Sequence, residues 1–394
     1  MKKLIFLCIA AWFFCSCSSS DPSIMDATSS DNTPVTGQKI LLQVRTLSDH
    51  YPMTYAWDAD NGTLDAWTPE DNYVYWTAPE NPASTPVICH VTCTVTDDDG
   101  NTTTHTFTLT VAERLPETLY SEETNGITVV SMEKEATSSL GGVWISLDNE
   151  EVHYINSTAD STSTWTGTFG AMAIAYSSLS YSYALWGAPL TGNVVSEQSD
   201  SGTSSVTFPS IAEDGVIHSL LVSIADPGFF LLAGSDSGLH YYYTSTEGSE
   251  IWHDYTETGA THDLCMNADG TVAYAAADQG VFSLTGLNFT ALTEIYDGAA
   301  CAVYVDLADG SDVVWRVTGG IVCQNDLPLP SQPPVVVCSL DTDTKGRVWC
   351  GKYYWDGSAW HSPSALDPYD VDKVAASAEG LMYFLTGSGA FLRY

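Results

Sequence analysis

The stretch Thr342–Trp360, TDTKGRVWCGKYYWDGSAW, contains two polar turns, each followed by a short run rich in aromatic residues. Gly346 lies three residues before Trp349, and Gly357 lies three residues before Trp360. Glycine favours tight turns because it has no side chain to clash at positive φ. Short apolar runs bounded by such turns are typical of β-strands. The stretch therefore predicts short strands joined by tight turns.

The same arrangement recurs along the chain. A large apolar residue follows a glycine by two to five residues at six positions, and a seventh, at Trp186, lacks the leading glycine. These anchors are 34 to 45 residues apart: Trp144, Trp186, Leu231, Tyr274, Trp315, Trp349 and Tyr383. A repeat of this length, made of short strands, is the signature of β-propeller blades. We predict an all-β fold with a seven-bladed propeller over residues 114–394. Six blades, with the second unit as an irregular insertion, is the alternative.

The repeat resembles that of two-component-regulator-type propellers, in which D-x-x-G-x-v-W-x-G marks the second strand of a blade and its turn. TDTKGRVWCG is the closest match here, and ADGTVAYAA is a fainter one. The final unit lacks an outer strand. Residues 116–130 resemble residues 293–305, where the outer strand of the fourth unit is expected. We therefore expect residues 117–121 to supply the missing strand and close the last blade, which removes an exposed sheet edge.

Residues 35–113 are expected to form a separate domain. In VICHVTCTVT, residues 87–96, apolar residues alternate with mostly polar ones, which indicates a strand with one buried face. Asp99-Gly100 then provides a hairpin turn. With YAWDADNG and YVYWTAPE upstream, this segment resembles PKD-type and bacterial Ig-like β-sandwiches, although the GDG signature of PKD domains is absent. Cys89 and Cys93 are interpreted as core thiols and Asp97–Asp99 as a turn, so no metal or cofactor is predicted.

The first twenty residues, MKKLIFLCIAAWFFCSCSSS, resemble a bacterial lipoprotein signal. Lys2 and Lys3 precede an apolar run that is too short to span a bilayer comfortably. Cleavage of the signal segment 1–17 before Cys17 would leave that cysteine lipidated, and a plain signal peptide cut without lipidation is the alternative. Residues 18–34 read as a flexible tether. We expect an outer-membrane protein that is lipid-anchored at the cell surface.

Composition excludes some functions. The chain has 49 acidic and 12 basic residues, a formal net charge of -37, which disfavours nucleic acid as a partner. No common hydrolase, metalloprotease or nucleotide-binding motif is present, so we expect no catalysis. His262-Asp263 begins an inner strand; the preferred interpretation is a solvated or hydrogen-bonded loop histidine, and a position facing the central channel is the alternative. The seven cysteines after Cys17 are interpreted mainly as buried thiols, with one bridge between neighbouring blades left open.

Aromatic residues on or after the blade turns are the candidates for ligand binding. Most are expected to pack between blades, and the others to stack on sugar rings: Tyr242, Trp252, Tyr353, Trp355 and Trp360. The leading hypothesis is a non-catalytic surface lipoprotein that binds a polysaccharide. The alternatives are a scaffold for protein interactions in an envelope complex and a propeller glycoside hydrolase or lyase. A line of exposed aromatics would favour polysaccharide binding, and a large apolar patch would favour the interaction scaffold. Converging carboxylates in a cleft would favour the hydrolase or lyase.

Overall fold

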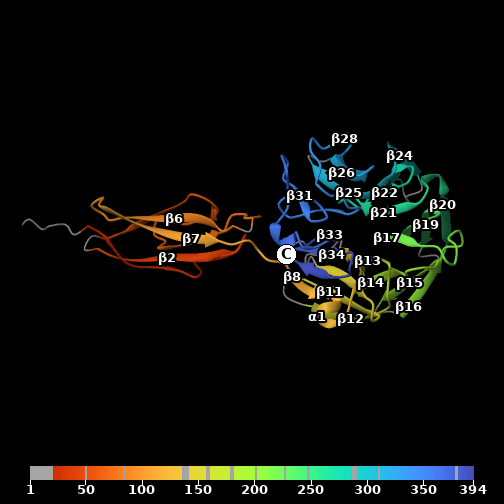
Figure 1. The fold of residues 1–394 in the computed structure, drawn as a ribbon, viewed down its shortest axis with the longest axis horizontal. Coiled ribbons are helices and arrows are strands. Elements are labelled where there is room, and N and C mark those ends of the chain that lie inside the picture. The colour runs from red at the N-terminus through yellow and green to blue at the C-terminus, as the bar shows by residue number, and fades with distance from the viewer. Residues whose placement is uncertain are drawn as a thin grey trace, which may run out of the picture. The chain divides into compact units, whose positions relative to one another are not determined.

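The computed structural model describes residues 21–48, 51–83, 85–134, 142–156, 160–177, 182–199, 202–225, 228–245, 249–285, 291–308, 311–377 and 380–394. It divides into two compact units, Met1–Arg114 and Leu115–Tyr394 (Figure 1). The all-β prediction is confirmed, because the helices of the described residues are one α-helix, α1 (Glu122–Asn125), and two short 3-10 turns, Thr256–Thr258 and Ser364–Leu366. None of these helices is long and apolar enough to cross a membrane.

The described residues of the first unit form two antiparallel sheets. One has the order β1-β2-β5-β4 and the other β3-β6-β7: β1 (Ser23–Ser29), β2 (Lys39–Leu47), β3 (Thr54–Ala59), β4 (Thr63–Leu64), β5 (Tyr73–Thr77), β6 (Val87–Thr96) and β7 (Thr102–Val111). Both sheets contribute to one core, which includes Leu42, Trp76 and Leu109. Cys89 and Cys93 are buried free thiols in β6. The alternating face of β6 therefore lies in the core of a two-layer unit.

The tether prediction is wrong over β1. Residues Ser23–Ser29 pair antiparallel with β2, from Ser23 opposite Leu47 to Ser29 opposite Leu42. Ile24 and Ala27 also pack against the core. An edge strand satisfies its backbone through its neighbour and needs few apolar side chains, so a Ser- and Asp-rich composition did not reveal it.

The described residues of the second unit form seven four-stranded antiparallel sheets, in sequence order apart from β8. The innermost strands are β9 (Val129–Lys134), β13 (Ala171–Ser177), β17 (Ile217–Ala225), β21 (Thr261–Met266), β25 (Ala300–Ala308), β29 (Leu340–Thr342) and β33 (Val371–Ala376). The second strands are β10 (Val143–Leu147), β14 (Ser182–Ala188), β18 (Gly228–Ser235), β22 (Ala273–Ala277), β26 (Ser311–Thr318), β30 (Val348–Cys350) and β34 (Met382–Thr386).

The outer half of each sheet is more exposed. The third strands are β11 (Glu151–Ile155), β15 (Val194–Ser199), β19 (Gly238–Ser245), β23 (Gly280–Thr285), β27 (Ile321–Gln324), β31 (Tyr353–Trp355) and β35 (Phe391–Arg393). The outermost strands are β12 (Asp160–Thr166), β16 (Gly202–Thr207), β20 (Glu250–Tyr255), β24 (Ala291–Asp297), β28 (Leu327–Pro328), β32 (Trp360–His361) and β8 (Glu117–Tyr120). β8 pairs with β35, so a strand from the start of the unit completes the last sheet.

The sheets are arranged as a β-propeller (Figure 1). Each innermost strand contacts the innermost strand of the next sheet, and β33 contacts β9, so the series closes into a ring. The seven repeat anchors all lie on second strands and are all buried. Hydrophobic clusters lie between adjacent sheets, for example that of Trp186 and Leu231. The repeated large residue therefore fills the space between neighbouring sheets.

The turn before β30 explains the repeat motif. Gly346 has φ +74°, and the Asp343 carboxylate accepts hydrogen bonds from the N–H groups of Lys345 and Arg347, at 2.9 and 3.0 Å. Its second oxygen, Oδ2, accepts from Trp349 Nε1 at 3.0 Å and from Arg347 Nε at 2.6 Å. One buried carboxylate thus holds the turn and fixes the anchor indole, which gives the aspartate, the glycine and the tryptophan their spacing.

Candidate functional site

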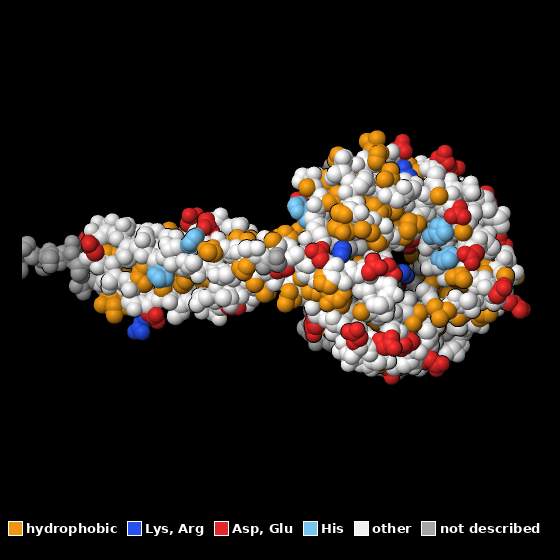
Figure 2. Space-filling model, in the orientation of Figure 1, with side chains coloured by type: hydrophobic (Ala, Val, Ile, Leu, Met, Phe, Trp, Pro, Cys, Tyr) orange, Lys and Arg blue, Asp and Glu red, His pale blue; other side chains and the backbone are white. Residues whose placement is uncertain are grey.

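The ring encloses a cavity of about 1020 Å³, lined by the innermost strands of all seven sheets. Figure 2 shows a hollow at the centre of this unit with basic side chains at its edge. Its charged lining residues are Glu133, Lys134, Asp263, Asp269, Asp306, Asp341 and Lys373. Apolar side chains such as Leu220 and Val303 lie between them. Most interactions near the centre of the ring link one sheet to another.

Asp341 is the best-anchored charged group of the cavity. Its carboxylate is buried and accepts hydrogen bonds from its neighbour Thr342 N and from Ala376 N on β33, both at 2.7 Å. Lys134 Nζ, from β9, lies 2.8 Å from Asp341 Oδ1. Three sheets therefore meet at this carboxylate, since Asp341 belongs to β29. The Asp341 contacts hold the ring together and leave little of this group for a ligand.

Asp263 on β21 likewise bonds to the backbone of its own strand and of the next sheet. It accepts hydrogen bonds from its neighbour Leu264 N at 3.0 Å and from Val303 N, on β25, at 2.9 Å. Burial raises the pKa of the Asp263 carboxyl to about 6, against the lowering effect of these hydrogen bonds. His262 is hydrogen-bonded as expected, with Nε2 2.9 Å from Asp278 Oδ1, but it lies on β21 rather than in a loop. Both His262 and Asp263 line the cavity, which is the alternative position that the sequence left open.

Glu133 differs from the two aspartates. Among the described residues, no hydrogen bond holds its carboxyl group. Burial raises the pKa of Glu133 to about 8, the attraction of Lys373 opposes the rise, and the charges of Asp263 and Asp341 add to it. The raised pKa favours the protonated form of the carboxyl, which can donate an O–H hydrogen bond. The cavity lining thus combines a carboxyl group with a raised pKa, lysine donors and carboxylate acceptors.

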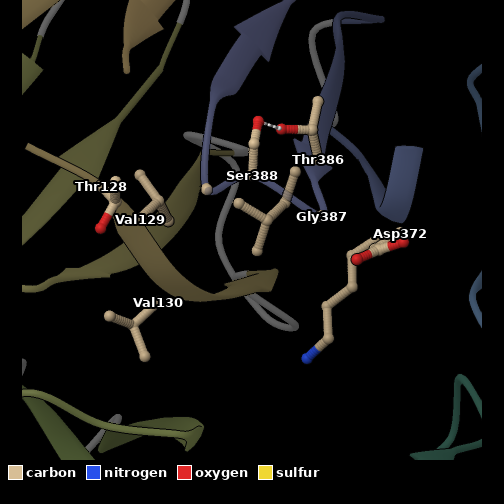
Figure 3. Close-up of a pocket in the computed structure, with 10 residues that line it drawn as sticks. Thr128, Val129, Val130, Asp372, Thr386, Gly387 and Ser388 are labelled. Atoms are coloured by element: carbon tan, nitrogen blue, oxygen red, sulfur yellow. Dashed lines mark hydrogen bonds between the residues drawn. The ribbon is translucent and has the colours of Figure 1, made fainter. Parts of the chain in front are cut away.

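A smaller cavity of about 380 Å³ lies between the first and last sheets (Figure 3). Its charged lining residues are Asp372 and Lys373, and the rest of its lining is mainly backbone and small side chains. Thr386 Oγ1 and Ser388 Oγ are 3.0 Å apart and bonded to each other. The central cavity is the better candidate site because it combines a larger volume with side chains from every sheet.

The predicted binding residues Tyr242 and Trp252 pair with each other away from the ring centre. Their ring centroids are 4.4 Å apart across β19 and β20. Tyr242 is only 7% exposed and packs against the neighbouring sheet, whereas Trp252 is 37% exposed. Tyr241 and Tyr242 face opposite sides of β19, as alternation along a strand requires, and both sides are covered by core clusters. Burial removes Tyr242 from any ligand surface and leaves Trp252.

The other three predicted residues lie on a different sheet. Trp355 on β31 is 6% exposed and packs with Trp315 in the adjacent cluster. Trp360 is half-buried against the same cluster and donates Nε1–H to Ser331 O at 2.9 Å. Tyr353 is also half-buried. The five aromatics therefore form no single line: Tyr242 and Trp355 are corrected to core residues, and Trp252, Tyr353 and Trp360 keep accessible surface.

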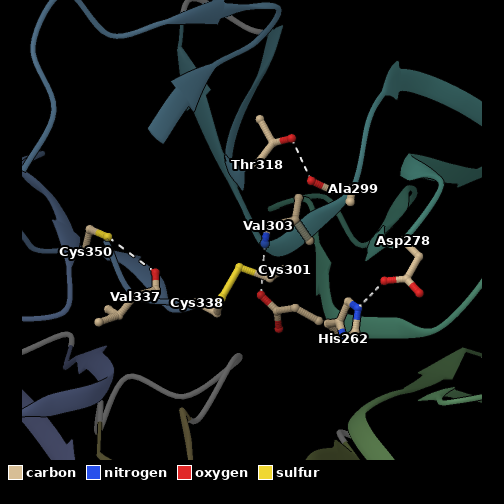
Figure 4. Close-up of a disulfide and its surroundings, with 10 residues drawn as sticks. His262, Asp278, Ala299, Cys301, Val303, Thr318, Val337, Cys338 and Cys350 are labelled. Carbon is tan, nitrogen blue, oxygen red and sulfur yellow. Dashed lines mark hydrogen bonds and ion pairs between the residues drawn. A yellow bond between two sulfur atoms is a disulfide. The ribbon is translucent and has the colours of Figure 1, made fainter. Parts of the chain in front are cut away.

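The cysteines divide between thiols and one bridge. Cys89, Cys93, Cys265, Cys323 and Cys350 are free, and Cys301 is bonded to Cys338 (Figure 4). Cys301 lies on β25, and Cys338 lies just before β29, so the disulfide joins neighbouring sheets. The prediction of buried free thiols is wrong for Cys301 and Cys338. The alternative, one disulfide between neighbouring blades, describes this pair. Cys17 lies outside the described residues.

A buried network on the third sheet has the bonding order of a Ser-His-Asp triad. Ser235 Oγ is 2.8 Å from His240 Nε2, and His240 Nδ1 is 2.7 Å from Asp254 Oδ1. Ser235 and His240 are fully buried, so a substrate carbonyl cannot reach the hydroxyl that occupies Nε2. Asp254 also accepts from Ser210 Oγ at 2.5 Å. The network ties the β18–β19 turn to β20 and is structural.

Sequence reasoning singled out His262 and Asp263 but missed the other charged residues of the central cavity. The available signal was a charged residue inside an otherwise apolar innermost strand, as in VVSMEK and VDKVAA. Such residues are unusual in strands covered on both faces and therefore indicate a cavity or a cross-sheet bond.

No protein-family model and no curated protein matches this chain. Three solved structures are similar in fold, and all are β-propeller proteins. The WD40 β-propeller domain of Doa1 has 13% identity and a TM-score of 0.44, covering 68% of this chain and 97% of that one. The extracellular domain of BT4673 from B. thetaiotaomicron has 12% identity and a TM-score of 0.48, covering 71% and 40%.

The third similar structure is a quinonprotein alcohol dehydrogenase-like protein, BT1487, from Bacteroides thetaiotaomicron VPI-5482. It has 10% identity and a TM-score of 0.39, covering 94% of this chain and 95% of that one. At these levels the three likenesses carry no argument about the activity of this chain.

Proposed function

We propose that this protein is a non-catalytic, lipid-anchored surface protein whose seven-bladed propeller binds a neutral polysaccharide, with a PKD- or Ig-like domain as spacer. One observation carries the proposal: a cavity of about 1020 Å³ at the ring centre has hydrogen-bond donors and acceptors side by side. A sugar hydroxyl both donates and accepts, so it can accept from Lys373 and from a protonated Glu133 carboxyl, and donate to the cavity carboxylates Asp269 or Asp306.

Charge supports a neutral rather than an anionic ligand. Carboxylates outnumber lysines among the charged residues that line the cavity, and the formal charge of the whole chain is -37. An anionic polymer would be repelled at ordinary ionic strength. Two carboxylates of the cavity, Asp263 and Asp341, are already bonded to backbone N–H groups of the next sheet. This arrangement favours binding without cleavage.

A glycan array and a polysaccharide pull-down test the proposal, using the wild-type chain from Asp21 onward and two variants. Lys373→Met alters the cavity, and Trp252→Ala alters the exposed outer aromatic. We expect retention of a neutral glycan that weakens by about tenfold in Lys373→Met and stays unchanged in Trp252→Ala. Loss of binding only in Trp252→Ala would move the site to the outer strands and overturn the cavity.

Two further results would replace the proposed function. Capture of an envelope protein without any glycan would select the interaction scaffold. Release of shortened sugars, detected by product analysis in the same reactions, would select a hydrolase or lyase.

Anchoring is tested separately, at Cys17. The wild-type protein should fractionate with membranes and carry a lipidated N-terminal cysteine by mass spectrometry, and Cys17→Ala should be released. An unmodified mature N-terminus, or equal membrane association of both proteins, would contradict the anchor.

A further inference from the structure

Two histidines from neighbouring sheets meet at the wall of the central cavity. His218 lies on β17 and His262 on β21, both line the cavity, and their ring centroids are 5.6 Å apart. Their side chains are 30% and 32% exposed, so both rings are open to solvent. Figure 2 shows pale blue histidine atoms close together on the face of this unit.

Each histidine sits on a β-bulge at the same place in its sheet. The register of β17 shifts between Ile217 and Ser219, and that of β21 shifts between Thr261 and Asp263. A bulge leaves one residue unpaired and re-aims its side chain. The equivalent bulge on β25 falls at Cys301, which bonds to the neighbouring sheet through Cys338. Bulged side chains at this level therefore reach across the gap between sheets.

Each ring also has a carboxylate behind it. His218 Nε2 lies 2.7 Å from Asp236 Oδ1, and His262 Nε2 lies 2.9 Å from Asp278 Oδ1 (Figure 4 shows the second pair). An ionised carboxylate only accepts, so it places the proton on Nε2 and leaves the lone pair of the neutral ring on Nδ1. Within the described part of the chain, neither Nδ1 atom has a hydrogen-bond partner. Histidine ligands of metals usually donate the other ring N–H to a carboxylate, a backbone carbonyl or water, which fixes the tautomer in this way.

We propose that His218 and His262 bind one divalent transition-metal ion of the kind that prefers imidazole, such as Zn²⁺, through their Nδ1 atoms. With a Zn–N distance of about 2.1 Å, each ring centroid lies about 3.2 Å from the metal. Two such centroids are about 5.2 Å apart when the angle at the metal is tetrahedral. They are about 6.4 Å apart when the two rings lie on opposite sides of the metal. The observed 5.6 Å falls between these limits. The remaining coordination positions face the cavity and are filled by water or by a ligand oxygen.

Isothermal titration with Zn²⁺ tests the site on the chelator-treated full-length mature protein. We expect one Zn²⁺ per chain, and an affinity lower by at least about 10-fold in His218→Ala and in His262→Ala. Asp236→Asn keeps both ligands but weakens their support, so it should lower the affinity by about 10- to 100-fold.

His361→Ala is the matched control. His361 is 36% exposed and bonded to Asp356 Oδ2 at 2.8 Å, and no second histidine ring pairs with it in the described residues. It should bind Zn²⁺ as the wild type does. If a His→Ala variant fails to fold, His218→Asn, which can still donate to Asp236, replaces it.

A Cu²⁺ electron paramagnetic resonance spectrum provides a second readout. Coupling to two imidazole nitrogens in the wild type and to one in His262→Ala supports the site. Absence of stoichiometric binding, or equal loss of affinity in His361→Ala and the two cavity variants, overturns it.

Discussion

Arg393 Nη2 on β35 lies 2.5 Å from Glu117 Oε2 on β8, although the two residues are 276 positions apart in the sequence. Arg393 Nη1 also donates to Asn156 O, at 3.2 Å. The two strands β8 and β35 also pair through their backbones, with Phe391 opposite Tyr120 at one end and Arg393 opposite Glu117 at the other. The first and last segments of the propeller unit are therefore joined in one sheet.

Removal of β8 should destabilise the propeller. Tyr120 is 6% exposed, packs in the core cluster of Phe391, and is bonded through its hydroxyl to His153 Nδ1 at 2.8 Å. Loss of a buried aromatic side chain alone costs about 3–5 kcal/mol. A chain starting at residue 113 should unfold cooperatively, and one starting at 125 should melt lower and aggregate through the open edge. Equal melting temperatures of the two chains would contradict the role of β8.

Asp341→Ala should be more harmful than removal of its ion-pair partner. The substitution removes the acceptor of the buried Ala376 N–H, at about 1–3 kcal/mol, and also that of the part-buried Thr342 N–H. Lys134→Met keeps both of those bonds and loses only the ion pair, whose lysine is 36% exposed, so its cost should be smaller than that of Asp341→Ala. Thermal or urea unfolding measures both variants.

A matched control for Asp341→Ala is Asp326→Asn. Asp326 is 85% exposed and lies 3.7 Å from Arg316 Nη2, so its change should be within about 0.5 kcal/mol. A loss at Lys134→Met as large as that at Asp341→Ala would show that the ion pair, not the backbone bonds, is what matters.

The Cys301–Cys338 disulfide should stabilise the unit. It closes a loop between residues 37 apart, and bonds of this kind typically contribute about 2–4 kcal/mol. A double variant, Cys301→Ala with Cys338→Ala, should melt at a lower temperature than the wild type. Reductant should lower the wild-type melting temperature toward that of the variant and leave the variant unchanged. If reductant lowers the melting temperature of both proteins equally, the lowering does not come from this disulfide.

Glu133 should make stability fall as pH rises. The folded-state pKa of about 8 lies above the ordinary value of 4.5, so the folded protein binds more protons than the unfolded chain between these pH values. Stability therefore decreases through this window and levels off above the folded pKa. Glu133→Gln, which is neutral throughout, should have a shallower decrease between pH 6 and 8, measured as the midpoint of urea unfolding.

The control for this pH dependence is Glu123→Gln, on the exposed helix α1. It should keep the wild-type slope. Asp263, with a pKa raised to about 6, contributes in the same direction but mainly below pH 6. Parallel profiles for the wild type and Glu133→Gln would mean that the Glu133 carboxyl is ionised in the folded protein.

The recurrence of large anchors indicated the sheets, because each sheet of a propeller must fill the same gap against its neighbour. Trp349 and Tyr383, for example, both lie on second strands and both are almost fully buried. The polar segment with Ser23–Ser29 was misread because edge pairing depends on backbone hydrogen bonds, which composition does not encode. Local patterns therefore identified core strands better than edge strands.

The sequence by itself determined the all-β class and the spacing of the buried anchors, since both depend on side-chain periodicity within a few residues. Only the tertiary structure decided which side chains are accessible. Alternation separates the two faces of a strand, but in a closed ring both faces are covered by neighbouring sheets, so Tyr242 and Trp355 are buried whichever way they point. The cavity residues Glu133, Asp263 and Lys373 are far apart in the sequence and become neighbours only because the ring closes.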